Sequence, residues 1–273
     1  MLNSVLFLLL LGSPAPETVT FKTVAGQELK MDVYSPATVS GRVPAVVVVH
    51  GGAWTSGDRT QMAQVCRAIA DSGMVAVATS YRLAPTHKWP AMIEDVQDSV
   101  RYVRDNAAKL KVDPNRIGAA GASAGGHLSL LLGTTDGWPN GNSTGKTSSK
   151  VKAVFNLFGP TDLSQDFNRT IANVLSQNVL GKPYAEAAAE IKSFSPVTFV
   201  TRTSAPVYTV QGKADPLVPF KQAERLDEVL KKNGVPHTLV LVEGMVHGVN
   251  QSKPEEMKAV ADAVAWLKAQ LTK

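Results

Sequence analysis

The sequence predicts an α/β fold, in which a mostly parallel central sheet has helices on both faces and antiparallel strands precede it. Along most of the 273 residues, segments patterned as strands alternate with segments patterned as helices, which is typical of parallel sheets. Four consecutive valines at 46–49, bounded by Pro44 and by glycines, predict a strand buried on both faces. Because no repeat or linker interrupts this order, we expect residues 17–273 to form one domain.

The segments "TVTFKT" and "ELKMDVYSP" predict an antiparallel ribbon that turns at Ala25-Gly26. Met92, Val96 and Val100 recur at helical spacing and predict a helix at 91–110. The other elements are expected as follows: helix 60–72, strand 74–81, a turn at Asp113-Pro114, strand 116–123, helix 124–133, polar loop 134–149, strand 151–159, strand 205–212, helix 219–233, strand 237–244 and helix 255–271.

Residues 161–200 interrupt the alternation with "TIANVLSQNVLG" and "YAEAAAEIKSF", which predict short helices. An insert in this position either covers a site as a small helical lid or is a surface elaboration without a role. Both interpretations stay open.

Composition and charge exclude some classes of function. The net charge is +5 and no basic run exceeds Lys231-Lys232, so the clustered basic patch of a nucleic-acid binder is missing. Cys66 is the one cysteine, which excludes an intrachain disulfide, and we interpret it as a small core or surface residue. No feature specifies an oligomeric state. The apolar run at 5–11 is too short for a stable membrane span; it predicts an export leader at residues 1–16, with a tolerated hydrophobic start as the alternative.

The turn "GASAG" places Ser123 between a predicted strand and a predicted helix. A nucleophile elbow, G-x-S-x-G, requires this context, because only very small residues fit around so tight a turn. The N-terminus of the new helix favours negative charge beside the serine. A packing device or a phosphate cradle is the alternative, although the spacing differs from the dinucleotide-binding G-x-G-x-x-G.

A second glycine-rich loop, "HGGAW", follows the valine strand. Attack of a serine on an ester carbonyl creates an oxyanion, which needs backbone N–H donors already aimed at it. Gly51 and Gly52 let the loop bring its N–H groups close, and the N–H of Ala124 supplies a further donor. We interpret His50 as a structural residue that holds the loop by hydrogen bonds.

The segments "HGGAW", "SYRLAP" with "WPAMIEDV", and "GASAGG" occur in this order. From about Val19 onward the chain thereby resembles the α/β-hydrolase fold, and within it the esterases of the hormone-sensitive-lipase type. The resemblance implies that Gly52 and Ala53 donate to the oxyanion. Many members carry HGGG where this chain has Ala53, and "HGGAWTSGDR" is similar to the branch of feruloyl esterases, acetyl-xylan esterases and arylformamidases.

The fold's order of a serine, then an acid, then a histidine implies two partners on loops after late strands. Asp215 in "GKADPLVP" and His247 in "GMVHGV" fit this order, whereas His127 is assigned to helix packing. Glu243 is a candidate support for the His247 loop. The competing acids are interpreted as cap or helix-surface residues: Asp162, Glu94 and Asp95.

These residues predict a serine carboxylesterase that acts on small, short-acyl esters and needs no metal or cofactor. His247 is expected to take the proton from Ser123, with Asp215 orienting its ring. Trp54 and Trp89 are candidates either for an aromatic or sugar-binding pocket or for core packing. The alternatives are an acetyl-xylan or feruloyl esterase acting on plant-polysaccharide-linked esters, an arylformamidase, and an inactive ligand-binding protein of the hydrolase fold.

Overall fold

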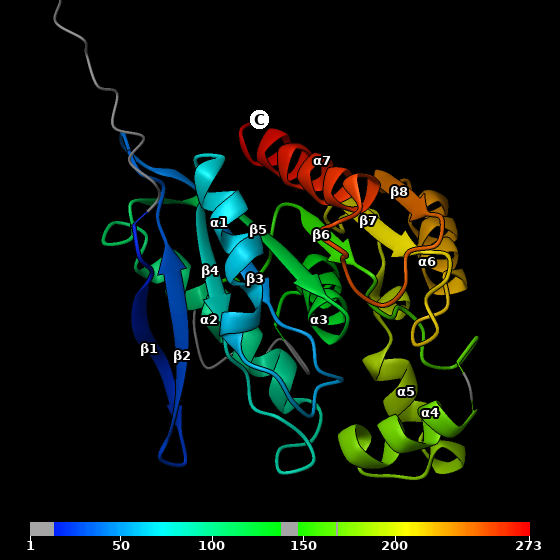
Figure 1. Ribbon diagram of the computed structural model, residues 1–273. Coiled ribbons are helices and arrows are strands. Elements are labelled where there is room, and N and C mark those ends of the chain that lie inside the picture. The colour runs from blue at the N-terminus through cyan, green and yellow to red at the C-terminus, as the bar shows by residue number, and fades with distance from the viewer. Residues whose placement is uncertain (1–13, 138–146, 168) are drawn as a thin grey trace, which may run out of the picture.

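The computed structural model describes residues 14–137, 147–167 and 169–273. Its eight-stranded sheet has the order β1-β2-β4-β3-β5-β6-β7-β8 (Figure 1). Strand β2 pairs antiparallel with both β1 and β4, and the remaining neighbours are parallel. The expected α/β-hydrolase architecture, with a mostly parallel sheet and antiparallel N-terminal strands, is therefore confirmed.

The strands are β1 Glu17–Val24, β2 Gln27–Tyr34, β3 Val43–Val49, β4 Val75–Thr79, β5 Val112–Ala122, β6 Val154–Leu157, β7 Val207–Gly212 and β8 His237–Val242. The α-helices are α1 Ala63–Asp71, α2 Ala91–Asp105, α3 Ala124–Thr134, α4 Arg169–Leu175, α5 Ala188–Phe194, α6 Lys221–Lys232 and α7 Pro254–Leu271. Short 3-10 turns lie at Arg59–Met62, Tyr184–Glu186 and Pro196–Phe199, and a π turn lies at Ser176–Leu180.

Two boundaries differ from the predicted ones. Helix α2 ends at Asp105 rather than at residue 110. The next residue, Asn106, donates from its side chain to the carbonyl of Tyr102 at 2.9 Å, and this bond competes with the helical hydrogen bonds. Strand β5 begins at Val112, because the predicted Asp113-Pro114 turn is an irregularity inside the strand.

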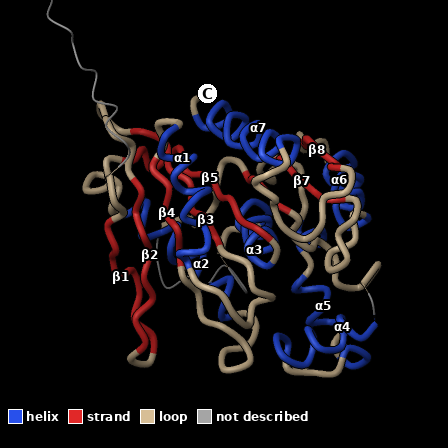
Figure 2. The backbone as a smooth tube through the Cα atoms, in the orientation of Figure 1, coloured by secondary structure: helices blue, strands red, loops and turns tan. Residues whose placement is uncertain are grey.

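Two apolar layers form the core, one on each face of the sheet. The valines of β3 alternate between them: Val47 and Val49 pack with α2, α3 and α6, whereas Val46 and Val48 pack with α1 and α7. Figure 2 shows the helices flanking the strands. Cys66 is a buried member of the α1–α7 layer. This two-sided burial is what the run of four valines predicted.

The insert at 161–200 holds α4 and α5, which lie together beside the sheet (Figure 1). It is anchored by Gln222, a fully buried side chain on α6. Oε1 of Gln222 accepts the backbone N–H groups of Thr161 and Asp162 at 2.9 and 2.8 Å, and its Nε2 donates to the Asp162 carbonyl. Whether the insert acts as a lid stays a prediction.

Residues 1–13 of the predicted leader, 1–16, lie outside the described residues, so the leader too stays a prediction. Within the part of the chain that the structure describes, each helix is too short or too polar to cross a membrane.

The prediction that Asp95 is a helix-surface residue is wrong. Its side chain is completely buried and binds Lys22 of β1 at 2.7 Å. Nε and Nη2 of Arg82 donate to its two oxygens at 2.7 and 2.9 Å, and the backbone N–H of Arg82 donates at 2.9 Å. Asp95 follows Met92 by three residues, so it falls on the buried face of α2. This ion pair joins the segments "SYRLAP" and "WPAMIEDV".

We expect Asp95→Ala to lower the free energy of unfolding by about 3–5 kcal/mol, because the largely buried Arg82 keeps only the partly exposed Glu94 as a carboxylate partner. Urea unfolding measures the change. Asp262→Ala is the matched control, since it removes an aspartate from an exposed helical pair with Lys258 and should not move the midpoint. Equal midpoints for the two variants would contradict a structural role for Asp95.

Candidate active site

Ser123 is the single residue between β5 and α3, and the turn around it is very tight. Its backbone has φ 55° and ψ −121°, a conformation that costs a non-glycine residue about 1–3 kcal/mol. A Cβ on Gly121 would lie 2.3 Å from the carbonyl oxygen of Gly125, and a Cβ on Gly125 would lie 2.0 Å from that of Val49. Only glycine fits at these two positions, so the geometry is that of the predicted elbow.

The structure brings the three predicted catalytic residues together. Nε2 of His247 lies 2.8 Å from Oγ of Ser123, and Nδ1 of His247 lies 2.7 Å from Oδ2 of Asp215. Because a carboxylate only accepts hydrogen bonds, Nδ1 carries the proton and Nε2 is free to accept the serine proton. Ser123 and His247 lie 124 residues apart in sequence, so the hydrogen bond between them joins two distant loops.

Asp215 is held as a carboxylate by its surroundings. Oδ1 accepts the backbone N–H groups of Leu217 and Val218 at 2.8 and 2.9 Å, and Oδ2 also accepts from Gln211 at 3.2 Å. Burial acts to raise the pKa of Asp215, but the hydrogen bonds from His247 and from these backbone groups outweigh it and hold the pKa below its usual value. The negative charge is therefore retained beside the imidazole.

The His247 loop is fixed by close packing. A Cβ on Gly212, at the end of β7, would lie 2.1 Å from the carbonyl oxygen of Met245, so the two loops touch backbone to backbone. The ring of Phe158, which follows β6, lies 4.7 Å from the His247 ring. These contacts leave the imidazole little freedom to turn away from Ser123.

The "HGGAW" loop borders the serine. A Cβ on Gly51 would lie 3.3 Å from Cβ of Ser123. The Gly51 carbonyl accepts from Tyr81 Oη at 3.4 Å and lies 2.7 Å from His50 Nδ1. The Gly52 carbonyl accepts the backbone N–H groups of Thr55 and Ser56 at 3.0 Å.

These bonds orient the predicted oxyanion donors. In a trans peptide the N–H points away from the preceding carbonyl, so fixing the Gly51 and Gly52 carbonyls fixes the N–H directions of Gly52 and Ala53. The Ser123 carbonyl accepts the N–H of His127 at 3.0 Å inside the helix. The N–H of Ala124 consequently points out of the N-terminus of α3, where the helix dipole adds to its effect.

His50 has the structural position that the sequence predicted. Its buried ring stacks on Tyr81 at 4.3 Å with an interplanar angle of 12°, and burial lowers its pKa. Tyr81 also donates to the His50 carbonyl at 3.1 Å. The pair fixes the base of the "HGGAW" loop.

An aromatic cluster lies behind this loop. It contains Trp54, Trp89, His127 and Phe194, and its ring pairs meet at 4.3 to 6.3 Å. Trp54 is 2 % exposed, so of the two roles considered for it the structure shows core packing. Trp89 is partly exposed and donates to Ser193 of the insert at 3.3 Å.

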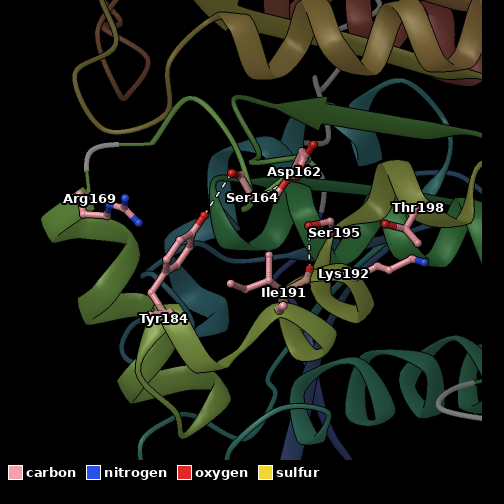
Figure 3. A pocket seen from close by; sticks show the side chains of 10 residues that line it. Asp162, Ser164, Arg169, Tyr184, Ile191, Lys192, Ser195 and Thr198 are labelled. Carbon is pink, nitrogen blue, oxygen red and sulfur yellow. Dashed lines mark hydrogen bonds between the residues drawn. The ribbon is translucent and has the colours of Figure 1, made fainter.

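A cleft of about 480 Å³ lies within the insert, between its first residues and α5 (Figure 3). Figure 3 shows Tyr184 pointing toward Ser164, with Arg169 at one end and Lys192 and Thr198 at the other. Its lining residues are Asp162, Ser164, Arg169, Tyr184, Ala185, Ala188, Ile191, Lys192, Ser195 and Thr198. The mixture of hydroxyl, cationic and apolar groups suits a polar organic ligand.

The remaining acids have other partners. Asp162 accepts from the backbone N–H of Ser164 at 2.9 Å and so closes an Asx turn, without a helix to cap. Glu243 forms an exposed ion pair with Lys213 at the surface. Among the described residues, the structure contains no cluster of three or more His, Cys, Asp or Glu side chains that could hold a metal ion.

Sequence reasoning missed several residues that position the site. Tyr81 and Phe158 both follow strands at the edge where Ser123 lies, so their position was a usable signal. Gln211 is a polar residue near the end of a buried strand, which was a second signal. Nothing local marked Phe194, because its role depends on where the insert folds.

The family profile BD-FAE matches residues 31–230. The chain is 33% identical over 194 residues to esterase LipC of Mycobacterium tuberculosis, covering 69% of this chain and 48% of LipC. Esterase LipQ of the same organism is 30% identical over 217 residues, covering 77% of this chain and 51% of LipQ. The chain thus spans about half the length of the curated relatives it matches.

Solved structures share the whole fold. A truncated carbohydrate esterase from gut microbiota has a TM-score of 0.84 at 27% identity, covering 96% of this chain and 98% of that one. Esterase Est2 of Thermogutta terrifontis has a TM-score of 0.81 at 30% identity, covering 93% and 92% of the two chains. Similar structures of Est2 hold propionate or butyrate.

His127 gives a prediction about acid stability. Burial lowers its pKa from 6.5 to about 3. Between these values the unfolded chain binds a proton at this ring and the folded chain does not. The stability contributed by the neutral ring is therefore complete above pH 6.5 and decreases as the pH falls toward 3, by up to about 1.4 kcal/mol per pH unit.

Urea unfolding of the wild type and of His127→Gln from about pH 7 to about pH 4 measures this slope. We expect the variant to lose stability less steeply as the pH falls, whatever its stability at neutral pH, because it lacks the His127 ring. His50 and His237 are present in both proteins and contribute equally to the two slopes. Identical slopes would show that His127 is not buried as a neutral ring.

Proposed function

Because the chain belongs to the BD-FAE family, we propose that it is a serine carboxylesterase that uses Ser123, His247 and Asp215. This proposal rests on two hydrogen bonds in sequence, from Ser123 to His247 at 2.8 Å and from His247 to the Asp215 carboxylate at 2.7 Å. The strained elbow and the oriented N–H groups beside it also favour acyl transfer. Intact nucleophile and base positions argue against an inactive ligand-binding protein.

In the proposed reaction, Ser123 Oγ attacks the ester carbonyl carbon while His247 Nε2 takes the hydroxyl proton. The N–H groups of Gly52, Ala53 and Ala124 bind the oxyanion. When the carbon–oxygen bond to the alcohol breaks, His247 returns its proton to the departing alkoxide. Water, activated by the same ring, then hydrolyses the acyl-enzyme. Asp215 stabilises the imidazolium at both steps.

We propose short acyl groups as the preferred substrates. The propionate and butyrate held by Est2 support this size. Acetyl groups carried on a polysaccharide are the second candidate, supported by the similarity to a carbohydrate esterase. From the predicted leader at residues 1–16 we also propose that the enzyme is exported.

Ser123→Ala should lower kcat by roughly 10⁶ if the three residues act as a unit. Hydrolysis of p-nitrophenyl acetate measures the loss of turnover, and mass spectrometry of the protein after fluorophosphonate treatment measures the loss of the nucleophile. Ser129→Ala is the matched control, because Ser129 is a buried serine on α3, the helix that begins after Ser123; it should keep both activity and labelling. Residual activity near the wild-type value in Ser123→Ala would identify another nucleophile.

A panel of p-nitrophenyl esters, acetylated xylan, methyl ferulate and N-formylkynurenine tests the substrate proposal. We expect kcat/KM to peak between acetyl and butyryl esters and to fall by about tenfold or more for octanoyl, since a pocket for a short chain rejects added methylenes. A higher kcat/KM on acetylated xylan than on the simple esters would favour the carbohydrate function. Preference for N-formylkynurenine would favour an arylformamidase instead.

A further inference from the structure

His127 is a fully buried histidine that the proposed mechanism does not use. It lies on α3 one turn after Ser123. Its Nε2 lies 2.6 Å from the backbone carbonyl oxygen of Phe194, which belongs to the insert. A carbonyl only accepts, so Nε2 carries the proton and donates.

The same ring packs against the "HGGAW" loop. Its centroid lies 4.9 Å from that of Trp54 at an angle of 83°, and Phe194 contacts Trp54 at 4.8 Å. Trp54 Nε1 is buried without a hydrogen-bond partner in the described residues. The indole is therefore held by ring packing, and its position depends on the position of its two neighbours.

The loop needs this support because its backbone is strained. Ala53 and Trp54 have φ 51° and 59°, in the left-handed region that non-glycine residues disfavour. Such conformations persist only where the surroundings over-determine them. The Trp54 carbonyl accepts the N–H of Ala84 at 2.9 Å. The Trp54 side chain packs between His127 and Phe194.

We propose that His127 is a positioning residue that links the insert to the oxyanion loop. The hydrogen bond from its Nε2–H to Phe194 fixes the orientation of the imidazole ring, which packs on Trp54. Through Trp54 it fixes the direction of the Ala53 N–H. The inference rests on the proposed function, because the loop matters to the reaction as the oxyanion site. The alternative is a histidine that merely fills the core.

Two amide variants separate these roles. In His127→Gln the side-chain nitrogen reaches about as far as Nε2, so the donor to Phe194 is kept. In His127→Asn the nitrogen reaches only as far as Nδ1, so that donor is lost. We expect kcat to fall by about 10- to 100-fold in the Asn variant, since displacing an oxyanion donor costs less than removing one. The Gln variant should stay within about threefold of the wild type and KM should be unchanged in both.

One readout distinguishes a positioned loop from a weakened core, and two further measurements serve as controls. Affinity for a trifluoromethyl ketone, which forms a tetrahedral adduct, should fall in parallel with kcat. The midpoint of the pH profile should not move, because His247 remains the base. A fluorophosphonate titration counts folded active sites, so kcat refers to folded protein only.

His237→Asn is the matched control. His237 is another histidine with a buried side chain and a lowered pKa, bonded to Asp227 and Thr209 at 2.9 Å. It should lose stability but keep kcat per titrated site. If His127→Asn behaves in the same way, or if the Asn and Gln variants lose kcat equally, His127 is a structural residue and the proposal is overturned.

The backbone amide chemical shifts of Gly52 and Ala53 test the link without turnover. We expect them to move in His127→Asn and to stay near the wild-type values in His127→Gln. If the wild type hydrolyses no ester, the proposed function fails, yet these shifts still decide whether His127 holds the loop. Unmoved shifts in the Asn variant would overturn the positioning role.

Discussion

Helix α3 begins so close to the end of strand β3 that no side chain fits between them. A Cβ on Gly125 would lie 2.0 Å from the Val49 carbonyl oxygen, so the chain must turn within one residue, and that residue is Ser123. The same approach brings Gly51 beside the serine and directs the Ala124 N–H out of the helix. Nucleophile and proposed oxyanion donors are thus placed by one close contact between backbones.

Long-range polar contacts hold the loops around that contact. Asp95 binds Arg82 and Lys22, Gln222 binds the start of the insert, and Tyr81 binds the base of the "HGGAW" loop. Asp95 and Gln222 lie on helices and hold loops or a terminal strand, whereas Tyr81 lies in the loop after β4 and holds a second loop. A buried polar group left without its partner costs free energy, so each of these contacts specifies one loop arrangement over others.

Strands, helices and the elbow could be predicted because their signals are local. Alternation of apolar residues and paired glycines reflect the backbone of the segment that carries them, so β3, α3 and the turn at Ser123 were recognisable. Asp95 was misjudged because its partner Lys22 lies 73 residues away, although its place on the apolar face of α2 was visible. The role of Phe194 had no local signal at all.

The sequence by itself determined the fold, the elbow around Ser123 and the loop residues available as donors, because these follow from steric limits on short segments. It also determined which acid and histidine follow late strands. His247 was already the predicted base, but only the tertiary structure brings its Nε2 to 2.8 Å from the serine, because that contact joins loops 124 residues apart in sequence. It likewise decided that Trp54 belongs to the core, since the insert folds back and covers it.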